Sequence, residues 1–88
     1  MSKLEEKLKE LGYHEKGTIY YIKDYGNLEL AINIENDIVL KDFSCVNVKE
    51  ISIYDKEMVY TITNAIKQAY SQLKADLKEL KKYEISNQ

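Results

Sequence analysis

Hydrophobic residues recur with period two in the middle of the chain and with helical spacing at both ends. The alternation is clearest over 28–35, where every second residue is leucine or isoleucine and most of the residues between them are polar. Because successive side chains of a strand point to opposite faces, this pattern predicts a strand with one buried and one exposed face. Its hydrophobic side consists of Leu28, Leu30, Ile32 and Ile34.

Shorter patterns predict a strand on each side of this segment. Residues 18–23 predict a strand through their β-branched and aromatic content, and the turn-forming residues 24–27 follow them. Asn36 and Asp37 both tolerate positive φ and fit a two-residue hairpin loop. We therefore expect a third strand over 38–43.

The fourth strand has two interpretations. The valines of 44–48 alternate, and the isoleucines of 50–54 alternate out of phase with them. A one-residue bulge at 49–50 would join both segments into one strand. Alternatively, 44–48 is a connection and only 50–54 forms the strand.

The N-terminal segment 2–12 predicts a short helix. Ser2 and Glu5 fit a capping box, in which each side chain bonds to the backbone of the other residue. Three leucines lie four and three residues apart and form one apolar stripe. Gly12 stands where a glycine commonly ends a helix.

The segment 55–83 predicts a long helix, because its hydrophobic residues recur every three or four positions without an intervening glycine or proline. Asp55 suits the N-cap position, and Glu57 suits the first turn. The apolar stripe consists of Val59, Ile62, Ile66, Ala69, Leu73, Leu77 and Leu80. We expect residues 84–88 to form a frayed tail.

Together these elements predict an α+β fold in the order α-β-β-β-β-α, with an antiparallel β-meander over 18–54 packed against the long C-terminal helix. With 88 residues, the chain has room for a single domain, residues 1–88. No run approaches the ~18 apolar residues of a membrane span, and the N-terminus does not resemble a signal peptide. We therefore expect a cytoplasmic protein without a membrane partner.

The predicted helix is longer than the predicted sheet. Its 29 residues would span ~43 Å, whereas a seven-residue strand spans ~23 Å. The residues expected beyond the sheet are Leu73, Leu77, Leu80 and Tyr83. A leucine left in water forgoes roughly 1.5–3 kcal/mol, so either the N-terminal helix or a second copy of the chain should cover them. The second alternative makes these four residues the self-association site of a homodimer.

Charge is distributed unevenly along the chain. Residues 24–57 hold eight acids and three lysines, whereas 67–82 hold five lysines and two acids. Small acidic inhibitors from mobile genetic elements resemble the chain in this outline. The resemblance implies an alternative function, in which an acidic sheet mimics nucleic-acid charge and blocks a nucleic-acid enzyme. That function requires the acids at 24, 29, 35, 37, 42 and 50 to converge on one face.

The chain offers little for catalysis or for binding metals and cofactors. Its single cysteine excludes a disulfide framework and a multi-cysteine zinc site. The acids near the 36–37 turn lack the calcium-loop pattern, and the three glycines do not form a phosphate-binding loop. A nucleophile–base pair of Cys45 and His14 is conceivable and leaves a small enzyme as a third function. We expect no catalytic site, no cofactor and no metal.

Eight tyrosines are many for this length, and tyrosine is a rigid, amphipathic contact residue. The densest group surrounds the first predicted hairpin, and its acidic neighbours would lie beside it. These expected partner-contact residues are Tyr20, Tyr21, Tyr25, Asp24 and Glu29.

An α-β-β-β-α order resembles the double-stranded-RNA-binding domain in topology. In that family a lysine cluster at the start of the second helix contacts phosphates, but the matching residues here are Asp55, Lys56 and Glu57. We therefore expect no specific nucleic-acid binding. The function that remains is a small non-enzymatic protein-interaction module, which self-associates and binds a protein partner as an adaptor or inhibitor.

Overall fold

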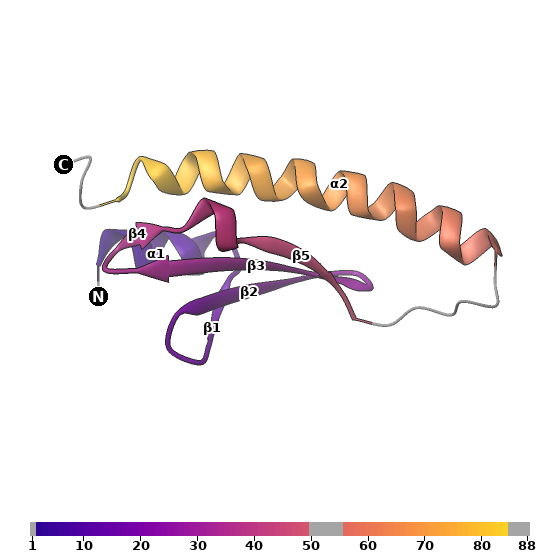
Figure 1. The fold of residues 1–88 in the computed structure, drawn as a ribbon. Coiled ribbons are helices and arrows are strands. Elements are labelled where there is room, and N and C mark those ends of the chain that lie inside the picture. Colours follow the sequence, from indigo (N-terminus) through magenta and orange to yellow (C-terminus); the bar gives the residue numbers. More distant parts are fainter. Residues whose placement is uncertain (1, 50–55, 85–88) are drawn as a thin grey trace.

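The structure is a computed structural model that describes residues 2–49 and 56–84, with side chains placed for 2–49 and 62–84. One long helix lies along one face of an antiparallel sheet (Figure 1). The elements in chain order are α1 (Lys3–Glu10), β1 (His14–Lys16), β2 (Tyr20–Tyr25), β3 (Leu28–Glu35), β4 (Ile38–Val39), the 3₁₀ turn η1 (Lys41–Phe43), β5 (Cys45–Val48) and α2 (Lys56–Lys81). This arrangement confirms the predicted α+β fold.

Helix α1 begins and ends where the sequence predicts. Ser2 is its N-cap, and the Ser2 Oγ accepts a hydrogen bond from the Glu5 backbone N–H at 3.1 Å. Gly12 has a φ of 100° just beyond the helix, a conformation that favours glycine. Leu4 and Leu8 are fully buried, so the predicted stripe faces the core.

Strand β3 lies at the centre of the sheet. β2 pairs with one edge of β3, and β1 pairs with the far side of β2. The other edge of β3 pairs with two short strands. β4 places Val39 opposite Ile34, and β5 places Val46 opposite Leu30.

The prediction of a third strand over 38–43 is wrong beyond Val39, because η1 interrupts it. The Ser44 Oγ accepts a hydrogen bond from the Asn33 N–H at 3.1 Å and donates one to the Leu40 carbonyl at 3.0 Å. A side-chain hydroxyl therefore takes the place of a sheet hydrogen bond, and the chain turns before pairing resumes in β5.

The remaining strand predictions have mixed outcomes. Asn36 and Asp37 have φ values of 54° and 59°, which confirms the two-residue hairpin loop. Residues 45–48 form a strand, so 44–48 is not merely a connection. The predicted strand 50–54 lies outside the described residues. β1 was not predicted, because its three residues carry no hydrophobic alternation.

The long helix also extends past the sheet, but at its other end. At 26 residues, α2 spans ~39 Å, while the eight residues of β3 span ~26 Å. The N-terminal part of α2 projects beyond the sheet, and the C-terminal part lies over β4 and α1 (Figure 1). The expectation that Leu73–Tyr83 would overhang is therefore wrong, since α1 lengthens the surface on which α2 packs.

Candidate functional site

Alternation along the strands gives the sheet two different faces. Helix α2 covers one of them (Figure 1), and the buried residues Leu30 and Ile32 belong to that side. The other face, called the open face below, carries no helix within the described part of the chain. Three rows of residues run across the strands of this face. The row at one end consists of Lys16, Tyr20 and Asn33. The central row consists of His14, Ile22, Ala31 and Cys45, and the row at the other end of Asp24, Glu29 and Asn47.

The open face is hollowed. This open-face hollow measures about 340 Å³ and is lined by Lys16, Tyr20, Ile22, Glu29, Ala31, Cys45 and Asn47. Ile22 and Ala31 are 9% and 3% exposed and form an apolar floor. The turn before β2 projects on the same side of the sheet (Figure 1), and Tyr20, which follows the turn and lines the hollow, is 39% exposed. Ile19 is 42% exposed but lies opposite Ile34 in the β2–β3 ladder, on the side that α2 covers. The open face thus combines an apolar recess with a partly exposed aromatic ring.

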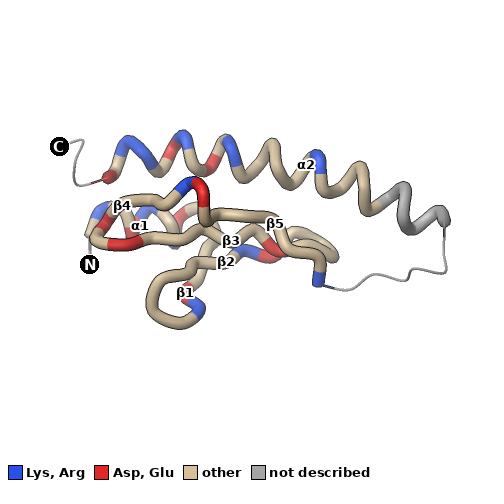
Figure 2. The backbone as a smooth tube through the Cα atoms, in the orientation of Figure 1, with Lys and Arg blue, Asp and Glu red and all other residues tan. Residues whose placement is uncertain are grey.

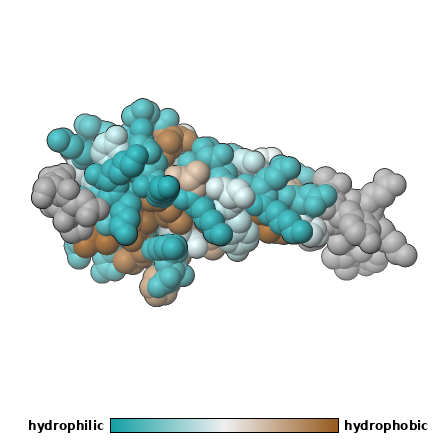
Figure 3. All heavy atoms as spheres, turned by 90° about the horizontal axis from the view of Figure 1, so that it is seen from above, coloured by the Kyte–Doolittle hydropathy of each residue, from teal (hydrophilic) through white to brown (hydrophobic). Residues whose placement is uncertain are grey.

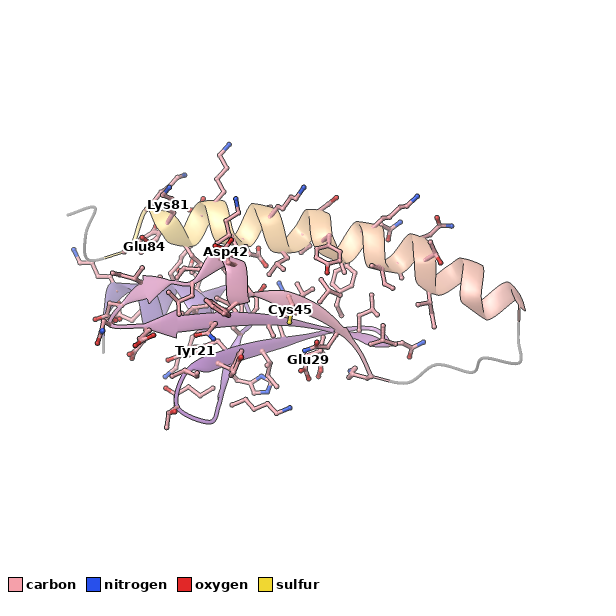
Figure 4. The ribbon with its side chains drawn as sticks, viewed as in Figure 1. Tyr21, Glu29, Asp42, Cys45, Lys81 and Glu84 are labelled. Atoms are coloured by element: carbon pink, nitrogen blue, oxygen red, sulfur yellow. The ribbon has the colours of Figure 1, made fainter. Side chains whose placement is uncertain are left out.

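Charges on the open face are partly separated along the strands. Lys16 lies in the row at one end, with the acid Glu35 beyond that row on β3. Asp24 and Glu29 lie in the row at the other end. Glu29 lies below the sheet, away from α2 (Figure 4). Lys49 contacts Asp24 at 3.1 Å and neutralises part of the acidic end.

The structure brings together three of the five expected partner-contact residues. Tyr20, Asp24 and Glu29 share the open face. Tyr21 is 6% exposed and belongs to the core, and Tyr25 is half-buried against that core. Because neighbouring residues of a strand point to opposite faces, the tyrosines of β2 do not form one patch.

The expected self-association residues lie in or against the core of a single chain. Leu73 and Leu80 are 3% and 0% exposed, and Leu77 and Tyr83 pack partly buried beside them. Helix α1 contributes to the same cluster, and its Lys7 Nζ lies 5.5 Å from the centre of the Tyr83 ring. The N-terminal helix is therefore the covering that the structure shows. Because these residues are not left exposed, they do not require a second copy of the chain to cover them.

Cys45 and His14 do not form a nucleophile–base pair. They occupy opposite ends of one row that crosses four strands, so about three strand spacings, or ~14 Å, separate their backbones. The Cys45 Sγ instead lies 3.5 Å from the Asn47 Oδ1. General-base activation requires hydrogen-bond reach, which this arrangement does not provide.

The acids needed for charge mimicry do not share one surface. Asp24 and Glu29 lie on the open face, and strand alternation places Glu35 on the same face. Asp24, however, is paired with Lys49. Asp42 lies on η1 beside α2 (Figure 4). The acid at position 50 lies outside the described residues. The described acids therefore give the mimicry alternative little support.

Sequence reasoning missed a buried polar cluster beneath α2. The Tyr13 hydroxyl donates to Asp76 Oδ2 at 2.7 Å, and Gln72 donates to Asp76 Oδ1 at 2.9 Å. The Lys23 Nζ lies 3.8 Å from the same carboxylate and 5.4 Å from the centre of the Tyr13 ring. Burial, reinforced by the hydrogen bond to Asp76, raises the pKa of Tyr13 well above its ordinary value. This cluster joins α2 to the sheet.

A second buried tyrosine lies at the edge of the core. Burial raises the pKa of Tyr21 to about 12, and the hydrogen bond from its hydroxyl to Glu15 at 3.0 Å acts in the same direction. The effect keeps the Tyr21 hydroxyl protonated, so that it remains a donor to Glu15.

Asn33 adds one unsatisfied polar atom to the end of the open face. Its side chain is 5% exposed, and within the described residues its Oδ1 has no hydrogen-bond partner. A buried acceptor left unpaired costs about 1–3 kcal/mol. Asn33 lies opposite Tyr20, so a donor from outside the chain that reached this end of the open face would relieve that cost.

No protein-family model matches the chain, and neither a curated protein nor a solved structure matches it. Among the described residues, no helix is long and apolar enough to cross a membrane. The same residues contain no group of three histidine, cysteine or acidic side chains that could hold a metal ion. Functional inference therefore depends on the surfaces of the chain itself.

Proposed function

We propose that the protein is a non-enzymatic protein-interaction module that pairs with a second copy of itself through the open face of its sheet. The observation that carries the proposal is the combination on one face of the open-face hollow and the exposed Tyr20 beside the projecting turn. A two-fold axis lets the turn of each copy enter the hollow of the other, as an isologous interface requires.

Charge complementarity supports the same arrangement. A two-fold axis along the central row reverses the strand direction of one copy relative to the other. The row that holds Lys16 then faces the row that holds Asp24 and Glu29. Opposite charges would meet on both sides of the apolar centre, and such an arrangement fixes register more than it adds affinity.

The size of the face limits the strength of the dimer. Four strands about 4.8 Å apart and six residues of about 3.3 Å give a patch of ~400 Å². Stable interfaces bury about 800 Å² on each partner. We therefore expect a reversible dimer with a dissociation constant in the micromolar range or weaker, formed and released as the concentration changes.

The test replaces Tyr20 by aspartate and measures the molecular mass by sedimentation equilibrium over a range of concentrations. Tyr20 is 39% exposed in one chain, so its burial against a second copy gains only about 0.6–1.2 kcal/mol per copy. Loss of both contacts should weaken the dimer about tenfold. Val48→Asp is the matched control, because Val48 is 40% exposed and lies opposite Leu28, on the side of the sheet that α2 covers.

Charge reversal provides an independent test of the register. Lys16→Glu and Glu29→Lys should each weaken the dimer, and the double variant should recover part of the affinity. Wild-type protein that stays monomeric at all concentrations, or equal effects of Tyr20→Asp and Val48→Asp, would contradict the proposed surface.

A further inference from the structure

A second hollow lies between η1 and the C-terminal half of α2, remote from the open face. It measures about 340 Å³, and its lining consists of Lys41, Lys74, Leu77, Lys78 and Lys81. Four of the five lining side chains are lysines, they come from two elements, and Leu77 supplies an apolar floor. We call it the lysine hollow.

The lysine hollow continues into a row along α2. At 100° per residue, Lys67, Lys74, Lys78 and Lys81 fall within one flank of the helix, and Figure 2 shows these basic positions spread along it. The row covers fourteen residue steps, or about 21 Å. Seen from above α2, this side of the molecule is mainly hydrophilic, with hydrophobic patches between the polar side chains (Figure 3).

The two acids of α2 whose side chains the structure describes lie on its other flank and already have cationic neighbours. Asp76 faces Lys23 at 3.8 Å, and Glu79 lies 3.9 Å from Lys7 and 3.1 Å from Lys82. Within the described residues, no ion pair of this kind forms at Lys41, Lys74 or Lys78. Charge is thus compensated on the flank toward α1. On the flank toward η1, Asp42 is outnumbered by Lys41, Lys74 and Lys78, and the net charge is positive.

Two exposed aromatic side chains lie on the same elements as the lysines. Phe43 ends η1, two residues after Lys41, and is 65% exposed, the highest value among the large exposed hydrophobic residues described. Tyr70 is 45% exposed and falls on the lysine flank, four residues before Lys74. A positively charged track with exposed rings is the combination that binds single-stranded nucleic acid, whose phosphates contact the cations while its bases stack on the rings.

We propose that the lysine hollow and its row bind the backbone of single-stranded nucleic acid without sequence preference. Lysine provides point charges and not the paired donors with which arginine reads guanine, so the site tolerates any sequence. This agrees with the expectation that the chain binds no specific nucleic acid. The site lies on a different surface from the proposed dimer contact and does not depend on it.

Salt dependence gives the proposal a quantitative test. Four lysine–phosphate contacts on a single strand give a slope of about −2.8 in log affinity against log salt. Affinity for a labelled oligothymidine of about 15 nucleotides should therefore fall roughly 50-fold between about 50 and 200 mM salt. Fluorescence anisotropy measures this affinity directly on the full chain.

Paired variants locate the site. Lys74→Gln with Lys78→Gln should reduce the slope by about 1.4 and weaken binding at low salt. Lys3→Gln with Lys9→Gln removes the same charge from α1 and should leave the slope unchanged. Phe43→Ala should weaken binding to oligothymidine about fivefold and leave binding to inorganic polyphosphate, which has no bases, unaltered.

Three outcomes would overturn the proposal. The first is the absence of binding at low salt, and the second is an equal loss in both lysine double variants. The third is binding of polyglutamate as strong as that of oligothymidine, which would identify an acidic protein segment as the occupant.

Discussion

Replacing Asp76 by alanine would remove the acceptor at the centre of the buried cluster beneath α2. Asp76 is 4% exposed and accepts hydrogen bonds from Tyr13 and Gln72, with Lys23 nearby. The variant leaves the Tyr13 hydroxyl buried without a partner and deprives Lys23 of its counter-charge. Both effects lower the stability of the folded state.

The magnitude follows from the burial of the groups. Removal of one member of a buried charged pair costs about 3–5 kcal/mol, and the 25% exposure of the Lys23 side chain favours the lower end, about 3 kcal/mol. The total stability of a chain of 88 residues is about 4–13 kcal/mol. The variant should therefore lose a large part of its stability and unfold about 12–24 °C lower.

Urea unfolding followed by circular dichroism measures this loss. The midpoint should fall by about 1–3 M for Asp76→Ala, and Asp76→Asn should lose less because it keeps an acceptor for Tyr13. Asp24→Ala is the matched control, because the Asp24–Lys49 pair is exposed and is worth about 0–1 kcal/mol. A midpoint for Asp76→Ala no lower than that of the control would refute the reasoning.

Two further predictions concern the same core. Because the pKa of Tyr13 is raised on folding, its stabilising effect is complete below about pH 10 and is lost as the pH rises further, by about 1.4 kcal/mol per pH unit. Urea midpoints measured between about pH 9 and pH 11 should fall less steeply for Tyr13→Phe than for the wild type. Leu80→Ala should cost about 2–5 kcal/mol, because Leu80 is fully buried, and Leu77→Ala should cost less because Leu77 lines the lysine hollow. Thermal unfolding of the two variants compares these costs, and equal values would argue against the placement of α2.

Local sequence patterns predicted an element correctly where neighbouring residues determine its structure. The alternation over 28–35 identified the central strand, the Ser2 cap identified the start of α1, and Asn36 with Asp37 identified the hairpin loop. Each depends on residues adjacent in sequence. The break after Val39 depends instead on the Ser44 hydroxyl, which bonds to the backbone of a residue eleven positions earlier.

Contacts between residues far apart in the sequence could not be predicted from such patterns. The hydrogen bond from Tyr13 to Asp76 joins residues 63 positions apart, and no spacing in the sequence indicates it. The expected tyrosine patch is divided between the two faces of the sheet, because the composition of the segment did not indicate which side chains face outward. Likewise, the excess length of α2 could be calculated from the sequence. The end that would project depended on where α1 packs, which the sequence pattern left open.

The most direct test of the proposed dimer surface is the change of backbone amide chemical shifts when the wild-type protein is diluted from millimolar to micromolar concentration. The proposal predicts shifts concentrated at Lys16, Tyr20, Glu29 and Asn47, with α2 unaffected. Shifts confined to α2, or no concentration-dependent shifts at all, would contradict it.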